Sequence, residues 1–458
     1  MEKDYRKAIK YGTKIIDIWL PWKIQHNRIP GLAVGVVHNG ELVYQKGFGY
    51  ADVELKIPVT PKTCFRIASI SKTFTAIAIM RLVEQNKIAL DDKVKKYLPW
   101  FKAEAKNNSL SDITLRQILS HSGGVYRDGD IPHFEGDTLP DAEELKRSIS
   151  NQTVVFKNST RFKYSNFGFA LLGEVIKKTS NIDYEEYITR HIIKKLGMKR
   201  TAPDFKKKYN AWLAKGYSRP LPYKKREAFH HSETKAYAPA MGALSNVYDL
   251  AKYVSSLSLK HNGGNILISE KSKEEITRKH RATGEKGESY GLGFDVVTIK
   301  KRKIVGHYGC FAGFTAQMYI DTTNDIGVIT LANTNDASVG LINTGIFEMI
   351  YEFVDKENKY KNKNKPSQQR KFEGVYRSRV EDTIVVGAGS TLVAFNANTN
   401  SPAKNWTRLR TKGQNKFLME TKSNFDASGE TATFIFGKKT HHATKVVFGA
   451  VQSERLMV

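Results

Sequence analysis

Hydrophobic and polar residues follow two patterns along this chain, and each pattern predicts one kind of element. Apolar residues that recur every three to four positions predict helices over residues 9–25, 69–86, 111–120, 166–178, 183–195 and 246–258. Runs of β-branched residues predict strands over residues 291–299, 303–308, 314–320 and 326–332. Two further strand-like runs within residues 31–52 are joined by Asn39-Gly40, a dipeptide typical of tight β-hairpins.

The order of these elements predicts the fold class. Strands come first, a long helical block follows, and strands then return. We therefore expect an α+β fold with one antiparallel sheet built from both ends of this region. Helices should flank the sheet, and the inserted helical block should form a subdomain of its own.

The composition of the chain changes near residue 355. Residues 356–371 are rich in Lys and Asn, contain a proline and lack apolar periodicity, which is typical of a linker. Beyond them, short β-branched and aromatic runs alternate with Gly, Asn and Ser, and none has a helical pattern. We predict a main domain over 1–355, a linker over 356–371 and a small all-β domain, a barrel or sandwich, over 372–458.

Charge and composition narrow the function only slightly. The 458 residues are 40% hydrophobic, as in a globular protein, and 73 Lys and Arg against 46 Asp and Glu give a net charge of +27. The lysines are scattered and no nucleic-acid-binding motif accompanies them, so we expect no nucleic-acid partner. Binding of other anionic polymers by a non-catalytic protein stays open as an alternative.

Cysteine usage and hydropathy exclude other classes of protein. The two cysteines cannot form a disulfide framework, no His/Cys cluster has metal-ligand spacing, and we expect neither a metal nor a cofactor. No apolar run is long enough for a transmembrane segment. The N-terminal residues lack a signal-peptide pattern, which favours a cytoplasmic location unless a signal was removed before this numbering begins.

The first candidate motif is Ser69-Ile70-Ser71-Lys72, at the start of an apolar helix. Residues three apart share a helical face, so the Lys72 amine can reach the Ser69 hydroxyl and act as its base if burial lowers the pKa of Lys72. The Ser69 N–H at a helix start also suits an oxyanion. Alone, this pattern is more often a helix cap followed by a surface lysine.

Two further motifs follow along the chain. Tyr164-Ser165-Asn166 precedes a strongly apolar helix, and a phenol near an ammonium group can relay protons. His307-Tyr308-Gly309-Cys310 lies in a strand-like run, where Gly309 allows close approach of a substrate and the Cys310 N–H can supply a second oxyanion donor. Each motif alone is more often structural.

Together and in this order, the three motifs resemble the serine β-lactamase-like and penicillin-binding-protein superfamily, whose signatures include S-x-x-K. The resemblance is to the branch that contains class C β-lactamases, D-aminopeptidases and related esterases. It covers about residues 28–350 and extends to FRIASISKTFTAIAIMRLVEQNKIALDD, ITLRQILSHSGGV and GHYGCFAGFTAQM. Peptide-cleaving members often carry a lipocalin-like barrel after the main domain, which matches the predicted C-terminal domain.

The resemblance implies a role for each motif residue. It makes Ser69 the acylated nucleophile, Lys72 its base, and Tyr164 the general acid or base on the leaving-group side. It also makes His307 a residue that orients substrate and supports the Tyr164–Ser69 proton network, and it leaves open which of Lys72 and Tyr164 takes the first proton. Substrate-binding and oxyanion roles fall to Asn166, Gly309 and Cys310. His121 in the loop Ser120–Gly124 is expected to be structural.

The third motif bears on the substrate, because His307 stands where β-lactamases carry a lysine. A histidine is mostly neutral at pH 7 and grips a carboxylate weakly. We therefore expect a serine peptidase acting on small peptides, either a D-amino-acid peptide or amide hydrolase or a carboxypeptidase-type enzyme. An esterase or weak β-lactamase is the alternative. The C-terminal domain is expected to support a homo-oligomer.

Overall fold

The computed structural model describes residues 4–101, 104–105, 108–109, 112–129, 139–149, 154–260, 267–356, 369–389, 391–421, 427–438 and 440–456. The chain divides into two compact units. One consists of Ile29–Gly340, and the other combines Met1–Arg28 with Leu341–Val458. No helix in the described ranges is long and apolar enough to cross a membrane.

The unit Ile29–Gly340 contains a nine-stranded antiparallel sheet with the order β3-β2-β1-β13-β12-β11-β10-β9-β8. Its strands are β1 (Gly31–His38), β2 (Glu41–Asp52), β3 (Ile57–Pro58), β8 (Arg281–Ala282), β9 (Glu288–Tyr290), β10 (Asp295–Ile299), β11 (Arg302–Phe311), β12 (Phe314–Asp321) and β13 (Ile326–Ala332). β1 pairs with β13 from Leu32↔Ala332 to His38↔Ile326. The prediction that both ends of this region build one sheet is confirmed.

Local backbone chemistry explains the first hairpin and one departure from the predicted strands. Asn39 and Gly40 both have positive φ, 51° and 76°, as a two-residue hairpin turn requires. The strand predicted over 291–299 is wrong for its first four residues, because only 295–299 pair as β10. Gly293 has a φ of 79°, and Gly291 N–H bonds to the Phe294 carbonyl at 2.8 Å, so these residues form a turn.

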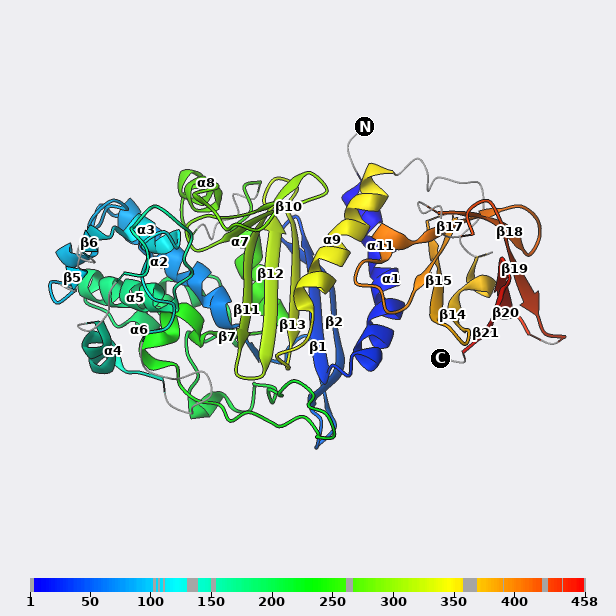
Figure 1. Cartoon of the computed structure of the whole chain (residues 1–458), viewed down its shortest axis with the longest axis horizontal. Coiled ribbons are helices and arrows are strands. Elements are labelled where there is room, and N and C mark those ends of the chain that lie inside the picture. The colour runs from blue at the N-terminus through cyan, green and yellow to red at the C-terminus, as the bar shows by residue number, and fades with distance from the viewer. Residues whose placement is uncertain are drawn as a thin grey trace. The chain divides into compact units, whose positions relative to one another are not determined.

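The helical block lies beside the strands in this unit, with α2, α3, α5 and α6 grouped together (Figure 1). Its helices are α2 (Ser71–Glu84), α3 (Leu115–Leu119), α4 (Ala142–Ile149), α5 (Asn166–Ser180), α6 (Tyr184–Ile188), α7 (Val247–Ser256) and α8 (Glu270–Thr277). Short sheets pair β4 (Phe65–Arg66) with β7 (Leu244–Ser245) and β5 (Glu104–Ala105) with β6 (Asn108–Ser109). The helix predicted over 183–195 is α6 followed by a π-helical turn, η4 (Thr189–Ile193).

Glycines let α7 pack closely on the sheet. A Cβ added to Gly35 of β1 would lie 2.5 Å from Val247, and one added to Gly327 of β13 would lie 2.3 Å from Val254. The helix therefore rests directly on the strand backbone. Another π-helical turn, η7 (Ala238–Gly242), follows a short 3-10 turn, η6 (Lys235–Tyr237), and precedes α7.

The second unit contains α1 (Tyr5–His26), α9 (Val339–Asp355) from Leu341 onward, and a closed eight-stranded barrel. The barrel strands are β14 (Gly374–Arg377), β15 (Asp382–Ala388), β16 (Thr391–Asn396), β17 (Thr407–Thr411), β18 (Lys416–Glu420), β19 (Thr431–Phe436), β20 (Ala443–Phe448) and β21 (Val451–Arg455). Phe372 packs at 4.9 Å between ring centroids against both Phe417 and Phe434 in its core. Closure leaves no exposed strand edge.

Two details of this unit bear on the sequence predictions. A short helix, α11 (Pro402–Asn405), interrupts the strands where no helix was expected. It is too short to show apolar periodicity, and Pro402 at its first position has the φ that begins a helix. Most of the linker predicted over 356–371 lies outside the described residues.

Candidate active site

Ser69 lies in a 3-10 turn, η1 (Ala68–Ile70), that leads directly into α2. The three-residue spacing places Lys72 in the first turn of α2, with its Nζ 3.1 Å from the Ser69 Oγ. Ser69 is partly exposed, whereas the Lys72 side chain is completely buried. The pair therefore joins an accessible hydroxyl to a desolvated amine.

The Lys72 amine has two further partners, and both are hydrogen-bond acceptors. Its Nζ lies 2.6 Å from the Asn166 Oδ1 and 2.8 Å from the Ala240 carbonyl in η7. Burial holds the pKa of Lys72 well below its usual value, and this effect outweighs the charge of Asp128, which raises the pKa. A neutral amine has two N–H groups for these two oxygens, which leaves its lone pair for the Ser69 hydroxyl.

The Tyr164-Ser165-Asn166 loop is anchored by its middle residue. Ser165 is the N-cap of α5, and its Oγ accepts a hydrogen bond from the Gly168 N–H at 2.8 Å. This cap leaves the residues on either side to face Lys72. The Tyr164 ring centroid lies 4.7 Å from the Lys72 Nζ, and the Asn166 amide bonds to it directly.

Tyr164 differs from Lys72 in the direction of its pKa shift. Desolvation raises the pKa of the Tyr164 phenol, although a hydrogen bond with Ser69 opposes this effect. Removal of water thus favours the neutral form of both side chains. For Lys72 the neutral form is the base, and for Tyr164 it is the proton donor.

Asp128 fixes the Asn166 amide and was not identified from the sequence. The Asn166 Nδ2 donates to the Asp128 Oδ1 at 2.5 Å. A carboxylate only accepts hydrogen bonds, so the amide must turn its nitrogen to Asp128 and its oxygen to Lys72. No pattern in the stretch Tyr126-Arg127-Asp128 marks this residue, because the contact joins positions 38 residues apart.

His307 on β11 is buried, and both of its ring nitrogens are engaged. The Nε2 lies 2.8 Å from the Tyr290 hydroxyl, and the Nδ1 lies 2.5 Å from the Tyr308 carbonyl. A carbonyl can only accept, so Nδ1 carries the proton and the Tyr290 O–H donates to Nε2. Burial lowers the pKa of His307, which favours this neutral tautomer.

These bonds show how His307 lies relative to Tyr164, whose proton network it was expected to support. Its ring lies 6.3 Å from the Tyr164 ring, centroid to centroid, and its nitrogens bond to Tyr290 and Tyr308. Tyr290 was also missed as a site residue, although it begins the run YGLGF that matches the family. His307 is therefore a neighbour of the Tyr164 phenol, held in place by a second tyrosine.

Gly309 brings β11 against the start of α2. A Cβ at this position would lie 2.2 Å from the Ile67 carbonyl oxygen and 3.0 Å from the Ser69 nitrogen. Only glycine allows the strand backbone to come this close to Ser69. The next residue, Cys310, has an exposed side chain and follows directly along the strand.

His121 supports the Tyr164-Ser165-Asn166 loop through one hydrogen bond and one ring contact. The Ser165 N–H donates to the His121 Nδ1 at 3.1 Å, and the His121 and Tyr164 ring centroids are 4.3 Å apart. Burial keeps the pKa of His121 well below its usual value, so the ring is a neutral acceptor.

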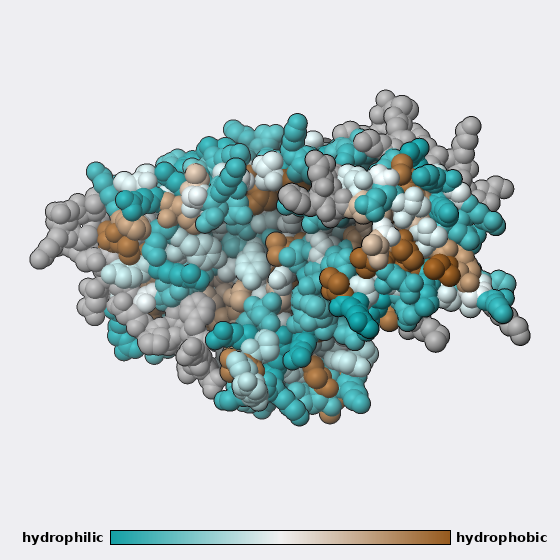
Figure 2. Space-filling model, turned by 45° about the vertical axis from the view of Figure 1, so that its right-hand side comes forward, coloured by the Kyte–Doolittle hydropathy of each residue, from teal (hydrophilic) through white to brown (hydrophobic). Residues whose placement is uncertain are grey.

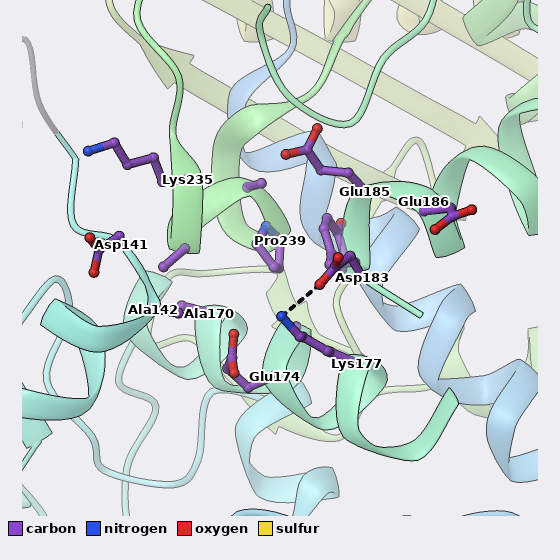
Figure 3. A pocket seen from close by; sticks show the side chains of 14 residues that line it. Asp141, Ala142, Ala170, Glu174, Lys177, Asp183, Glu185, Glu186, Lys235 and Pro239 are labelled. Carbon is purple, nitrogen blue, oxygen red and sulfur yellow. Dashed lines mark ion pairs between the residues drawn. The ribbon is translucent and has the colours of Figure 1, made fainter. Parts of the chain in front are cut away.

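A cavity of about 430 Å³ is lined by residues of α5, α6 and η7 (Figure 3). Ala238 and Pro239 line it, next in sequence to the Ala240 carbonyl that binds Lys72, whereas Ser69 is not among its lining residues. Lys177 pairs with Asp183 at 2.7 Å in its wall. In the described part of the chain, no group of three or more His, Cys, Asp or Glu side chains could hold a metal ion.

The chain resembles known proteins over most of its length. A family model described as β-lactamase matches residues 16–348. "Protein flp" of Staphylococcus aureus (strain MW2) is 27% identical over 332 residues, which are 71% of this chain and 64% of that protein. The chain thus spans less than two thirds of the length of these staphylococcal relatives. "Putative penicillin-binding protein PbpX" of Bacillus subtilis (strain 168) is 28% identical over 317 residues, 69% of this chain and 74% of that protein.

A solved structure resembles almost the whole chain. It is described as the octameric penicillin-binding protein homologue from Pyrococcus abyssi, and it covers 97% of this chain and 99% of its own at 26% identity, with a TM-score of 0.64. The fold is therefore shared across both units. Since the β-lactamase family model also matches more than half of the chain, this protein belongs to the β-lactamase family of serine hydrolases.

Proposed function

We propose that this chain is an active serine hydrolase that works through an acyl-enzyme on Ser69. One observation carries the proposal: a fully buried Lys72 amine lies 3.1 Å from the Ser69 hydroxyl while two carbonyl-type oxygens occupy its N–H groups. Such an amine is prepared to accept one proton, and the adjacent proton belongs to Ser69.

The reaction would proceed in two transfers. Lys72 takes the Ser69 proton as Oγ bonds to the substrate carbonyl carbon, and the N–H groups of Ser69 and Cys310 stabilise the oxyanion. The intermediate then collapses, the bond to the leaving group breaks, and the leaving group takes a proton through Tyr164. Water next attacks the acyl-enzyme and releases the acid and the free Ser69 hydroxyl.

The opposite pKa shifts favour Lys72 over Tyr164 as the first base. Desolvation lowers the pKa of Lys72 and raises that of Tyr164, so near neutral pH the amine is the group with a free lone pair. Tyr164 then serves as a neutral O–H that passes a proton to the departing group. Asn166 is a positioning residue for Lys72 in this scheme, besides its expected contact with the substrate amide.

The proposed substrates are small peptides or amides, including those with D-residues. The neutral tautomer of His307 supports this choice, because the third motif then supplies no permanent cation to grip the carboxylate of a β-lactam. An esterase with the same residues is the second candidate. We also propose a homo-oligomer built through the C-terminal barrel, in line with the octameric relative; light scattering of the full chain tests it.

Covalent labelling tests the nucleophile. The full chain is treated with a fluorophosphonate probe, and the adduct is located by mass spectrometry. We expect it on Ser69 and not on the nearby Ser71, whose Oγ is buried and bonded to the Ala68 carbonyl at 2.6 Å. No adduct, or equal labelling of the Ser69→Ala variant, would refute the proposal and favour a non-catalytic binding protein.

Turnover assays separate the substrate classes. A D-alanine p-nitroanilide is compared with p-nitrophenyl acetate, using Ser69→Ala as the blank. Cleavage of the anilide identifies a peptidase, and cleavage of the ester alone identifies the esterase. We expect Lys72→Met to reduce acylation at least about 100-fold, the usual effect of a lost acid–base group; near-normal rates would contradict the role given to Lys72.

A further inference from the structure

Two chain segments meet at one projecting edge of the unit Ile29–Gly340. The first is the turn between β2 and β3, at residues 53–56. The second is residues 216–229, which fold back on themselves: the Ser218 N–H bonds to the Glu227 carbonyl at 2.8 Å, and the Phe229 N–H bonds to the Gly216 carbonyl at 2.8 Å. Figure 1 shows both segments, in blue and green, at the lower edge of this unit.

A buried tyrosine fastens the two segments together. The Tyr217 hydroxyl accepts the Val53 N–H at 2.8 Å and donates to the Glu54 Oε2 at 2.8 Å. Beside it, Lys215 pairs with Asp52 at 2.9 Å. The two segments therefore form a single surface.

Large apolar side chains are exposed on this surface, which we name the lower-edge patch. Tyr223 at the tip of the second segment is fully exposed, and Leu55 at the tip of the first is 69% exposed. The apolar members of the patch are Tyr50, Val53, Leu55, Ile57, Leu221 and Tyr223. Brown apolar residues among teal polar ones are visible on the lowest part of the surface in Figure 2. An exposed apolar group of this kind marks an interaction site.

Basic residues stand next to these apolar residues along both segments. Lys56, Arg219, Lys224 and Lys225 are exposed and form no ion pair with any residue that the structure describes. In contrast, Arg226 at the base of the second segment is paired with Asp336 at 2.6 Å. Arg226 at the base of the patch is therefore held in an ion pair, whereas the four cations nearer the tips form none among the described residues.

We propose that the lower-edge patch docks this protein on an anionic phospholipid surface. Exposed apolar side chains at projecting tips can enter the interfacial region, while lysines and arginines beside them attract anionic headgroups. A second copy of the chain is a poorer occupant, because a symmetric contact would bring the same four cations face to face. Nucleic acid binding would not explain why apolar side chains such as Leu55 and Tyr223 are exposed at the tips beside the basic residues.

Docking in this way also orients the candidate active site. The Tyr217 N–H bonds to the carbonyl of Gly313 at 3.2 Å, in the turn between β11 and β12 that follows Cys310. The patch is therefore joined through one residue to the strand that approaches Ser69. The proposal is independent of hydrolase activity, since vesicle binding can be measured on the Ser69→Ala variant.

Vesicle flotation of the full chain tests the proposal. Vesicles of phosphatidylglycerol mixed with phosphatidylcholine are compared with pure phosphatidylcholine in about 0.1 M salt. We expect binding to the anionic vesicles only. The triple variant R219Q/K224Q/K225Q should lower the partition coefficient roughly 100-fold, from about a fivefold loss per charge near a membrane surface. The double variant L55S/Y223S should lower it at least about 10-fold.

The matched control removes three exposed lysines elsewhere, K194Q/K195Q/K199Q, and should change binding by less than about threefold because these residues lie outside the patch. Equal losses in both triple variants would overturn the proposal in favour of diffuse charge attraction. It would also be overturned by equal binding to neutral vesicles. Dissociation of an oligomer by L55S/Y223S in light scattering would assign the patch to a second copy, and DNA binding lost in the same variants would assign it to nucleic acid.

Discussion

Replacing Gly309 by alanine should damage catalysis through one added methyl group. The new Cβ would lie 2.2 Å from the Ile67 carbonyl oxygen and 3.0 Å from the Ser69 nitrogen, and both of these are backbone atoms that cannot rotate away. Ordinary van der Waals contact begins at 3.4 Å. The strand and the turn must therefore separate by about 1.2 Å.

This separation would widen the gap between Ser69 and Cys310, whose N–H groups are the proposed oxyanion donors. A misplacement of about 1 Å at a reacting centre costs about 100-fold in rate, and the loss of one oxyanion donor costs about as much. We therefore expect kcat/KM of Gly309→Ala to fall at least about 100-fold in hydrolysis of a p-nitrophenyl ester. The rate of labelling by a fluorophosphonate should fall in parallel.

Gly47→Ala provides the matched control. Gly47 is also a strand glycine, and its added Cβ would lie 2.1 Å from the Val59 carbonyl oxygen, but β2 is separated from β11 by three strands of the sheet. Both variants should lose a similar amount of thermal stability, and only Gly309→Ala should lose activity at a temperature where both are folded. Activity of Gly309→Ala within about fivefold of the unsubstituted chain would refute the reasoning.

Three further variants test residues that support the site. Asp128→Ala removes a charge that raises the pKa of Lys72. Because activity needs neutral Lys72, the acid limb of the kcat/KM profile should move to lower pH. An unmoved limb would show that the Asp128 carboxylate has only a structural role. Tyr290→Phe leaves the buried Nε2 of His307 without its donor, so it should lower the melting temperature and reduce kcat/KM about 5- to 10-fold at a temperature where the variant is folded; an unchanged kcat/KM would contradict a role for this bond in the site. Gly173→Ala would place a Cβ 2.3 Å from the proline ring of η7. We expect activity to fall about 10-fold, although alanine normally stabilises a helix relative to glycine. Full activity would show that η7 can shift without harm to the site.

Sequence alone predicts the parts of this protein that depend on local chemistry. The Asn39-Gly40 hairpin follows from the conformations that these two residues tolerate, and the Ser69–Lys72 contact follows from the geometry of one helical turn. The short strands of the C-terminal domain follow from its short apolar segments, whereas their closure into a barrel rather than a sandwich is seen only in the structure. These features can be predicted because each depends only on residues that are close together in the sequence.

The supporting contacts of the site were not predictable in the same way. The Lys72 bond to the Ala240 carbonyl joins positions 168 residues apart, and a backbone oxygen has no sequence signature. The sequence around Asp128 indicates only a loop, and the contact with Asn166 is seen only in the folded chain. These contacts depend on how the inserted helical block closes on α2, which periodicity does not report.

The composition of the second unit from both chain ends has a consequence for synthesis on the ribosome. Trp19 of α1 donates its Nε1–H to the Thr399 carbonyl at 3.0 Å, and Lys23 reaches Asn400, 377 residues later in the chain. At 5–20 residues per second, α1 waits roughly 20 to 75 s for these partners. It is made long before the residues that accept its hydrogen bonds. A chain cut at residue 356 would keep the contact between α1 and α9 but lose the acceptors of Trp19 and Lys23, and the buried ammonium group of Lys23 would then have no partner, so this chain should be less stable than the full one.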